Sequence, residues 1–311
     1  MKRKVVKHGS NTLTVSLPAK WCRLCGVEPG AELEVMEKGR SLVIGGNKDN
    51  RERTITADVS DLDRTSILLL VQGFYRYGYD MIEITSNVKT VPHHRTRANV
   101  NLPGLVYDVA NRLIGAEIIS ASSGRFVIKR LAEESMGDFP TVLRRIFLLL
   151  SEMLESFVNG AQKNDSDLLE SIEFKHANTK KFINYCLRLL NKYGDIDPRK
   201  TCFNFHVISL LSKSEDLVKN ASRLLLKHKI RMKPSSYELL KDIQQSVKMY
   251  YELFYDYKIE KVGEMNKHRD SFRDRLFATK LSDKESLVVG GLSQIVELVL
   301  DMTETRMALE D

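Results

Sequence analysis

The sequence predicts a multidomain α+β protein with a small β-rich N-terminal domain, a central α+β module and an all-helical C-terminal domain. Short β-branched or alternating segments, separated by turn residues, fill residues 1–46. Strand-like and helical segments alternate over 53–133. From 138 to 311 Pro and Gly are sparse, and apolar residues recur at the i, i+3, i+4 and i+7 spacing of helices.

The N-terminal 46 residues are expected to form four short strands and one helical turn. The strands are Lys4–Lys7, Thr12–Leu17, Leu33–Glu37 and Ser41–Ile44. The helical turn covers Pro18–Cys25, because Pro suits an early helical position and Gly26 stands where a C-terminal cap belongs. Residues 45–53 are rich in Gly and charge, which is typical of a linker.

The central module, residues 53–133, is expected to alternate strands and helices. Its segments are a strand over Arg53–Val59, a helix from Ser60 to Tyr77, a strand over Met81–Thr85, a basic loop over Lys89–Arg97, a helix over Leu102–Leu113, and strands over Glu117–Ser120 and Arg125–Arg130. Gly78 and Gly115 follow the two helices, where they would stop them.

Six helices are expected in residues 138–311, grouped as two three-helix units, 139–228 and 236–309. They run from 139 to Gly160, from Asp167 to Gly194, from about Cys202 to His228, over 236–279 as two helices broken near Tyr257–Gly263, and from Ser282 to 309. Two such units in series suggest an internal repeat.

The net charge of +7 is concentrated near the N-terminus. Residues 1–23 hold six Lys and Arg and no Asp or Glu. A concentrated basic patch attracts a polyanion, whereas the same charge spread evenly would only aid solubility.

The first 46 residues resemble the swapped-hairpin DNA-binding domains of the AbrB/SpoVT/MazE type. The matching positions are Ser10, Thr12-Leu13-x-Val15-x-Leu17-Pro18, Trp21, Arg23, Gly26-Val27, Gly30, Leu33 and Val35. The resemblance implies that two chains exchange hairpins to close one β-barrel, forming a homodimer through residues 1–46 that presents basic loops to double-stranded DNA. Independently, about 45 residues are too few to build a stable core alone, which favours a core shared by two copies.

The candidate DNA-binding residues lie on this segment. They are Lys2, Arg3, Lys4, Lys7, Thr12, Lys20 and Arg23. Arg3 and Arg23 are the best candidates for contacts to base edges, and the lysines for contacts to phosphates. The alternative is a solvated basic face on a barrel that serves only for dimerisation.

The rest of the chain resembles archaeal proteins that join such a domain to a PhoU-like helical domain. The resemblance is carried by Tyr77–Ile84, Leu113–Ile119, Phe126–Ile128 and Leu143–Ile146. It implies regulation of phosphate uptake, at the transporter or at its promoter. We therefore expect a DNA-binding transcription regulator whose helical domain senses a signal or partner. The alternatives are an adaptor that docks on phosphate transporter subunits without binding DNA, and a metal-binding PhoU-like protein.

Metal-binding acidic stretches are a further implication of this resemblance. Glu297, Asp301 and Glu304 share one helical face at the i, i+4, i+7 spacing, and Asp216 and Asn220 take the corresponding spacing in the first three-helix unit. Glu264, with His268 four residues later, could contribute further ligands. Oxygen ligands with an occasional His would suit a divalent Mg, Mn, Fe or Zn ion. Arg223, His176 and Lys180 depart from the acidic pattern, and the alternative is a set of solvated charges paired with Lys and Arg.

Other function classes have little support. No GxxxxGK[ST], GxSxG or HExxH motif occurs, so we expect no enzyme. Apolar runs such as Ile67–Val71 are far shorter than the roughly 18–20 residues of a membrane span, and no signal segment follows Met1, which favours a cytoplasmic protein that is not membrane-embedded. The polar segment 92–97 could bind an anion, assist DNA contact or be a plain exposed loop.

Overall fold

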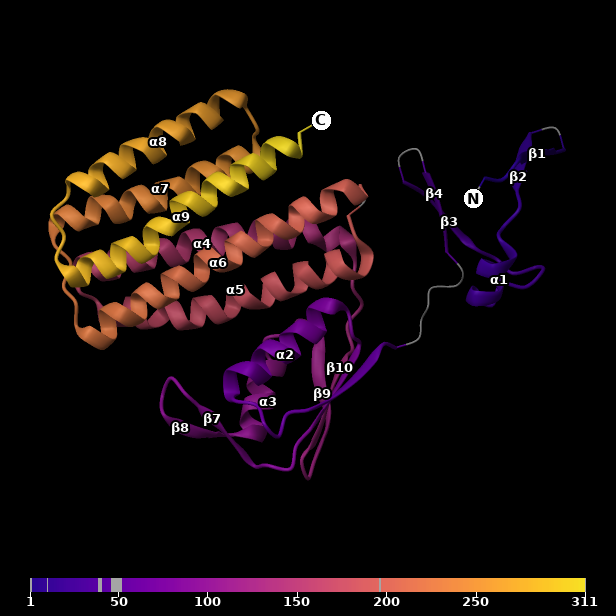
Figure 1. Cartoon of the computed structure of the whole chain (residues 1–311), viewed down its shortest axis with the longest axis horizontal. Helices are drawn as coiled ribbons and strands as arrows, with labels where there is room; N and C mark the ends of the chain where they lie inside the picture. Colours follow the sequence, from indigo (N-terminus) through magenta and orange to yellow (C-terminus); the bar gives the residue numbers. More distant parts are fainter. Residues whose placement is uncertain (1, 10, 39–40, 46–51, 196, 311) are drawn as a thin grey trace. The chain divides into compact units, whose positions relative to one another are not determined.

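The computed structural model describes residues 2–9, 11–38, 41–45, 52–195 and 197–310 (Figure 1). The chain divides into two compact units, Met1–Glu52 and Arg53–Asp311, which we call unit 1 and unit 2. The helical part dominates unit 2, so the fold class is α+β with a C-terminal helical region, as the sequence predicts.

Unit 1 consists of two separate hairpins and a short helix. Strand β1 (Val5–His8) pairs antiparallel with β2 (Thr12–Val15), and β3 (Glu34–Lys38) pairs antiparallel with β4 (Ser41–Gly45). Helix α1 (Ala19–Cys25) ends at Gly26, whose φ of 64° and N–H bond to the Cys22 carbonyl make the expected cap. The described residues of this single chain form no closed barrel, so the swapped-hairpin barrel stays a prediction.

A four-stranded sheet is the centre of the α+β module. Its strands are β5 (Thr54–Asp58), β6 (Met81–Thr85), β10 (Arg125–Arg130) and β9 (Ala116–Ser122), in that order across the sheet. Strands β5 and β6 are parallel and are connected by helix α2 (Arg64–Tyr77), while β10 is antiparallel to both of its neighbours. Helix α3 (Leu102–Ala110) completes the module, whose core includes Ile67, Val71, Ile84 and Val106.

The prediction of a basic loop over residues 89–97 is wrong in part. Strands β7 (Thr90–His93) and β8 (Ala98–Asn101) pair as a hairpin across this stretch. Their apolar signal is weak because only Val91 and Val100 face the core cluster. The following helix also ends at Ala110 rather than at Leu113, since the last N–H groups bond three residues back instead of four.

Among the described residues, six helices form the rest of unit 2, as predicted. They are α4 (Phe139–Lys163), α5 (Ser166–Tyr193), α6 (Pro198–His228), α7 (Pro234–Tyr255), α8 (Ile259–Ala278) and α9 (Asp283–Ala308), preceded by the 3-10 turn η1 (Met136–Asp138). They lie roughly side by side (Figure 1) and share one buried apolar core that runs from Phe139 to Met302.

Some helix boundaries differ from the predictions because contacts with neighbouring helices, which the local sequence does not show, decide them. Helix α4 passes through Gly160 and stops at Asn164, which adopts φ 52°. A side chain at Gly160 would meet Leu169 at 3.0 Å, so this glycine allows α4 and α5 to approach closely rather than ending the helix. The cap of α5 is Asp165, not Asp167, and α6 begins at Pro198 rather than at Cys202.

Helix α9 is long and apolar enough to cross a membrane, with a mean hydropathy of 1.4 over an 18-residue stretch, and is the one such helix among the residues described. No continuous apolar run marks it in the sequence, because Glu and Asp interrupt the pattern. It packs against α6 and α7, and the core helix of a water-exposed bundle meets the same criterion.

Candidate functional site

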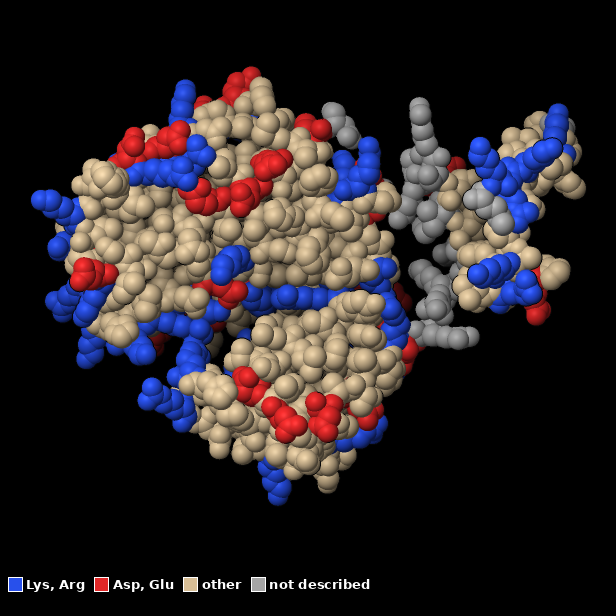
Figure 2. Space-filling model, in the orientation of Figure 1, with Lys and Arg blue, Asp and Glu red and all other residues tan. Residues whose placement is uncertain are grey.

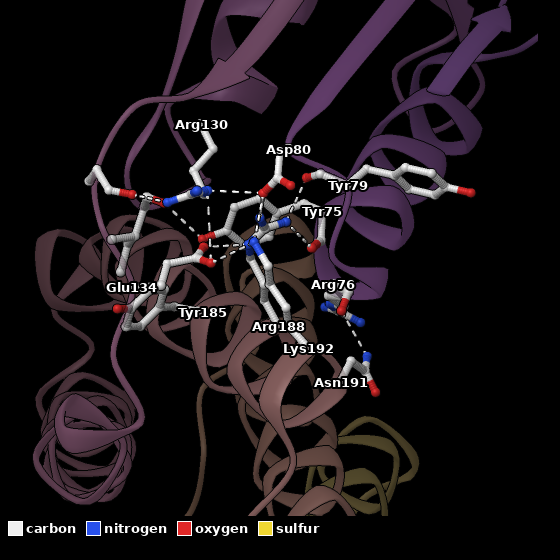
Figure 3. A network of polar contacts seen from close by, with 12 residues as sticks. Tyr75, Arg76, Tyr79, Asp80, Arg130, Glu134, Tyr185, Arg188, Asn191 and Lys192 are labelled. Atoms are coloured by element: carbon white, nitrogen blue, oxygen red, sulfur yellow. Dashed lines mark hydrogen bonds and ion pairs between the residues drawn. The ribbon is translucent and has the colours of Figure 1, made fainter. Parts of the chain in front are cut away.

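The α+β module and the helical bundle are joined by a network centred on Arg188 of α5 (Figure 3). This side chain is fully buried. Its Nη2 lies 2.6 Å from Asp80 Oδ1, and its Nη1 donates to the carbonyls of Tyr75 at 2.9 Å and Tyr79 at 2.6 Å. Its Nε pairs with Glu134. All three of its nitrogens are therefore occupied by protein acceptors, which indicates a structural role.

Asp80 is held ionised by the same network. Burial disfavours its charged form, but Lys192 Nζ at 2.8 Å, the Arg53 N–H and Arg130 Nε at 3.0 Å outweigh this and lower its pKa to about 2. The junction thus contains a buried carboxylate that keeps its charge at all physiological pH values.

A second polar region, which we call the seam pocket, lies between α2, the β7–β8 hairpin, α5 and α6. Its volume is about 470 Å³. Seven cationic side chains line it against two carboxylates, an excess of five positive charges. The cations are Arg64, Arg76, Arg95, Arg112, Lys180, Lys219 and Arg223, and the carboxylates are Glu173 and Asp216. Figure 2 shows Lys and Arg side chains gathered along the seam between the helical bundle and the module.

The inner wall of the seam pocket is an ion-pair cluster. Lys180 Nζ lies 2.6 Å from Glu215 Oε1 and 3.3 Å from Asp216 Oδ2. His176 Nε2 lies 2.9 Å from Asp216 Oδ1, and Lys219 pairs with the same carboxylate. Two neighbouring carboxylates are thus already neutralised by the protein's own ammonium groups.

Burial sets the protonation of this wall. Desolvation raises the pKa of Glu215 to about 7 against the opposing charge of Lys180. Desolvation, helped by the charges of Lys219 and Lys180, lowers the pKa of His176 to about 4, so its imidazole is neutral near pH 7. For Asp216 the bond from His176 and the two lysines overcome burial and hold the pKa far below its ordinary value.

The predicted metal ligands are not brought together. Asp216 faces Lys180 and Lys219 as described, and Glu297 pairs with Arg273 at 2.9 Å. The other four, Asn220, Glu264, Asp301 and Glu304, are exposed on α6, α8 and α9. Among the described residues no three His, Cys, Asp or Glu side chains are grouped so that they could hold a metal ion. We therefore base no proposal on a metal.

The predicted DNA-binding residues all lie on the surface of unit 1. Lys2, Arg3 and Lys4 precede β1, Lys7 and Thr12 lie on β1 and β2, and Lys20 and Arg23 lie on α1. Each side chain is exposed, and within the described residues none of the six cations pairs with a carboxylate. Lys and Arg outnumber Asp and Glu on the face of unit 1 that Figure 2 presents.

Several apolar side chains of unit 1 are exposed as well. Val5, Val6, Leu13 and Val15 of the first hairpin are 46–70% exposed, and Leu24 of α1 is 84% exposed. No residue of unit 1 whose side-chain burial is described is buried. The Cys25 thiol is also free and exposed in this single chain.

The aromatic residues of the segment 250–257 lie in the core of the helical region or pack against it. Tyr250 is fully buried and donates to the Met302 carbonyl at 3.0 Å. Phe147 lies 5.2–5.8 Å, between ring centroids, from Tyr250, Tyr251, Phe254 and Tyr255. This packing favours a role of these rings in the core over stacking on nucleic-acid bases.

Sequence reasoning did not find the seam pocket. Its arginines come from α2, the β7–β8 hairpin, the turn after α3, and α6, so no local spacing connects them. The only signal was the polar segment 92–97, which contributes His93 and Arg95. No protein-family model, no curated protein and no solved structure matches this chain.

Proposed function

We propose that this protein is a dimeric DNA-binding regulator of transcription, in which unit 1 binds the duplex and unit 2 receives the signal. The observation that carries the proposal is the surface of unit 1. Six cations without acidic partners and a set of uncovered apolar side chains occur together in about 50 residues. The apolar side chains call for a covering surface, and the concentrated cations suit an anionic partner.

The uncovered apolar side chains support a second copy of the chain as the first partner. A segment of this size buries too little surface to be stable by itself. Pairing two copies would cover the hairpins and place two sets of cations on one body. This is the arrangement that the resemblance to swapped-hairpin domains implies.

The unpaired cations support nucleic acid as the second partner. Lys and Arg side chains that contact phosphates release condensed counterions, which makes the affinity fall with salt. The basic side chains of unit 1 lie before β1, on β1 and on the short helix α1, where they can contact a duplex backbone. The likeness of residues 53–311 to PhoU-like proteins supports phosphate uptake as the regulated process.

A salt series of DNA binding tests the proposal. Full-length protein is titrated against a random-sequence DNA duplex by fluorescence anisotropy, together with a variant in which Lys2, Arg3, Lys4 and Arg23 are changed to Ala. We expect the variant to bind more weakly at low salt. The slope of log K against log salt should fall by about 0.9 for every phosphate contact removed.

A charge-matched variant is the control. Arg145, Lys163, Lys213 and Lys248 are exposed on the bundle, and changing them to Ala removes the same charge from unit 2. This control should bind DNA as the wild type does. Equal binding by all three proteins would refute the DNA role of unit 1 and favour the adaptor function. Sequencing the DNA recovered with the protein from cells then tests whether its sites lie beside phosphate-uptake genes.

A further inference from the structure

The seam pocket holds more positive charge than its own acidic groups can balance. Arg223 pairs with Glu173, Arg76 donates to Asn184 at 2.8 Å, and Lys180 and Lys219 pair with the inner carboxylates. The remaining three guanidinium groups, those of Arg64, Arg95 and Arg112, make no hydrogen bond or ion pair within the residues described.

These three cations repel one another and their neighbours. Burial and the charge of Arg112 lower the pKa of Arg64, and burial and the charge of Arg223 lower the pKa of Arg95. Glu173 and Asp108 offset this repulsion only in part, so folding has collected more positive than negative charge at one place. A cluster of this kind costs free energy unless an anion occupies it.

The pocket also has an unfilled hydrogen-bond donor. Gln72 of α2 lines the pocket, is only 4% exposed, and its amide nitrogen has no hydrogen-bond partner. Buried donors are almost always paired, so an unpaired one at a pocket wall indicates an acceptor that is supplied from outside.

We propose that the seam pocket binds a small anion with a di- or triphosphate group, held by Arg64, Arg95 and Arg112. Guanidinium forks pair with two phosphate oxygens at once, and three guanidinium groups without protein partners among the described residues suit a group with three or four negative charges better than a single phosphate. A volume of about 470 Å³ can hold either an inorganic polyphosphate or the phosphate chain of a nucleotide.

The site is independent of the proposed DNA contact, because all of its residues belong to unit 2. Both the α+β module and the bundle contribute side chains to it. A bound anion would therefore cross-link these two parts of unit 2 and stabilise their packing.

Calorimetric titration of the full chain with tripolyphosphate, ATP, pyrophosphate, inorganic phosphate and sulfate tests the proposal. We expect tripolyphosphate and ATP to bind and sulfate not to. Equal affinity for tripolyphosphate and ATP identifies the phosphate chain as the ligand, while at least about tenfold tighter ATP binding identifies a nucleotide. Inorganic phosphate binding as tightly as tripolyphosphate would overturn the polyphosphate class.

Arginine variants localise the binding. Arg64→Ala and Arg112→Ala should each weaken tripolyphosphate binding about tenfold, since each removes a charge-assisted pair. Arg145→Ala, an unpaired exposed arginine on α4, should leave it unchanged. The variant lacking Lys2, Arg3, Lys4 and Arg23 should also bind normally, which separates this proposal from the DNA-binding one.

Thermal melting separates a ligand site from a structural cluster. Without ligand, Arg64→Ala and Arg112→Ala should melt at or above the wild-type temperature because they relieve repulsion. With tripolyphosphate, the wild type should gain stability and the variants should gain less. A lowered melting temperature of both variants without ligand, or no heat and no stabilisation by any of the anions, would overturn the proposal.

Discussion

Arg188 shows how one residue can hold two parts of a fold together. Its guanidinium joins Asp80 of the module to Glu134 before the bundle, and all three groups are buried or nearly so. Desolvation makes such a cluster costly to form, but removing one member is more costly still, because the other charges stay buried without a partner.

We predict that Arg188→Ala destabilises the protein by about 3–5 kcal/mol. The measurement is the free energy of unfolding from urea denaturation. Arg199→Ala is the control, since Arg199 pairs with Asp197 at 2.7 Å but its side chain is 78% exposed. An exposed pair is worth about 0–1 kcal/mol. Equal losses in the two variants would contradict the structural role of the Arg188 network.

Single side chains of the seam pocket show the limit of reading a sequence. The spacing of Asp216 and Asn220 predicts which side of α6 they share, and the structure keeps them on that helix. Spacing does not predict what faces them, because Lys180 and His176 arrive from α5, about forty residues earlier in the chain. The same reason hides the arginines of the pocket, whose convergence depends on how four separate elements pack.

At the scale of elements, features set by neighbouring residues could be predicted from the sequence, whereas features set by contacts between distant elements could not. The predicted start of the last helix at Ser282 is confirmed, because Ser282 and Glu285 form a capping box within one turn. The six-helix count is confirmed because apolar periodicity is summed over many residues. Gly160 was predicted to end α4, but it is needed because the neighbouring helix α5 approaches closely at this position. The β7–β8 hairpin was not predicted, because only two of its side chains are apolar and face the core.

Glu285 links two helix starts, and its charge should therefore matter. Its carboxylate accepts from Ser282 N–H and Oγ at 3.0 and 2.7 Å, and from Lys233 N–H and Ser236 Oγ at 2.8 Å each. Burial opposes the charged form, but these donors prevail and lower the pKa to about 2 from the ordinary 4.5. The carboxylate thus contributes stability that is fully present above pH 4.5 and is lost as pH falls toward 2.

We predict that Glu285→Gln loses about 2–3 kcal/mol of unfolding free energy at pH 7. Its stability should also vary less than that of the wild type between pH 4.5 and 2. Denaturant unfolding across this range measures both effects. Glu304→Gln changes an exposed glutamate on the same helix and should follow the wild-type pH profile. A Glu285→Gln curve parallel to the wild type at low pH would show that the carboxylate is not the group that titrates.

At the scale of the whole molecule, the two units satisfy their cores in different ways. Unit 2 buries two apolar clusters within one chain. Unit 1 buries none of its described side chains, although its strands and its helix cap form locally. The strands and the helix of unit 1 thus form from interactions between neighbouring residues. The described residues of unit 1 do not bury its apolar side chains, so another surface is needed to cover them.

We predict that the protein is a dimer in solution and that Leu13→Glu converts it to a monomer. Leu13 is 70% exposed on β2, and burying such a side chain in a shared core contributes about 1.5–3 kcal/mol. A carboxylate there would have to be desolvated without a partner, which reverses the sign of the contribution.

Light scattering after gel filtration should give twice the mass of one chain for the wild type. Leu287→Glu, at a residue 67% exposed on α9, should remain dimeric. A dimer that survives Leu13→Glu but dissociates in Leu287→Glu would move the interface to the helical bundle, and a monomeric wild type would remove the shared core on which the DNA-binding proposal depends.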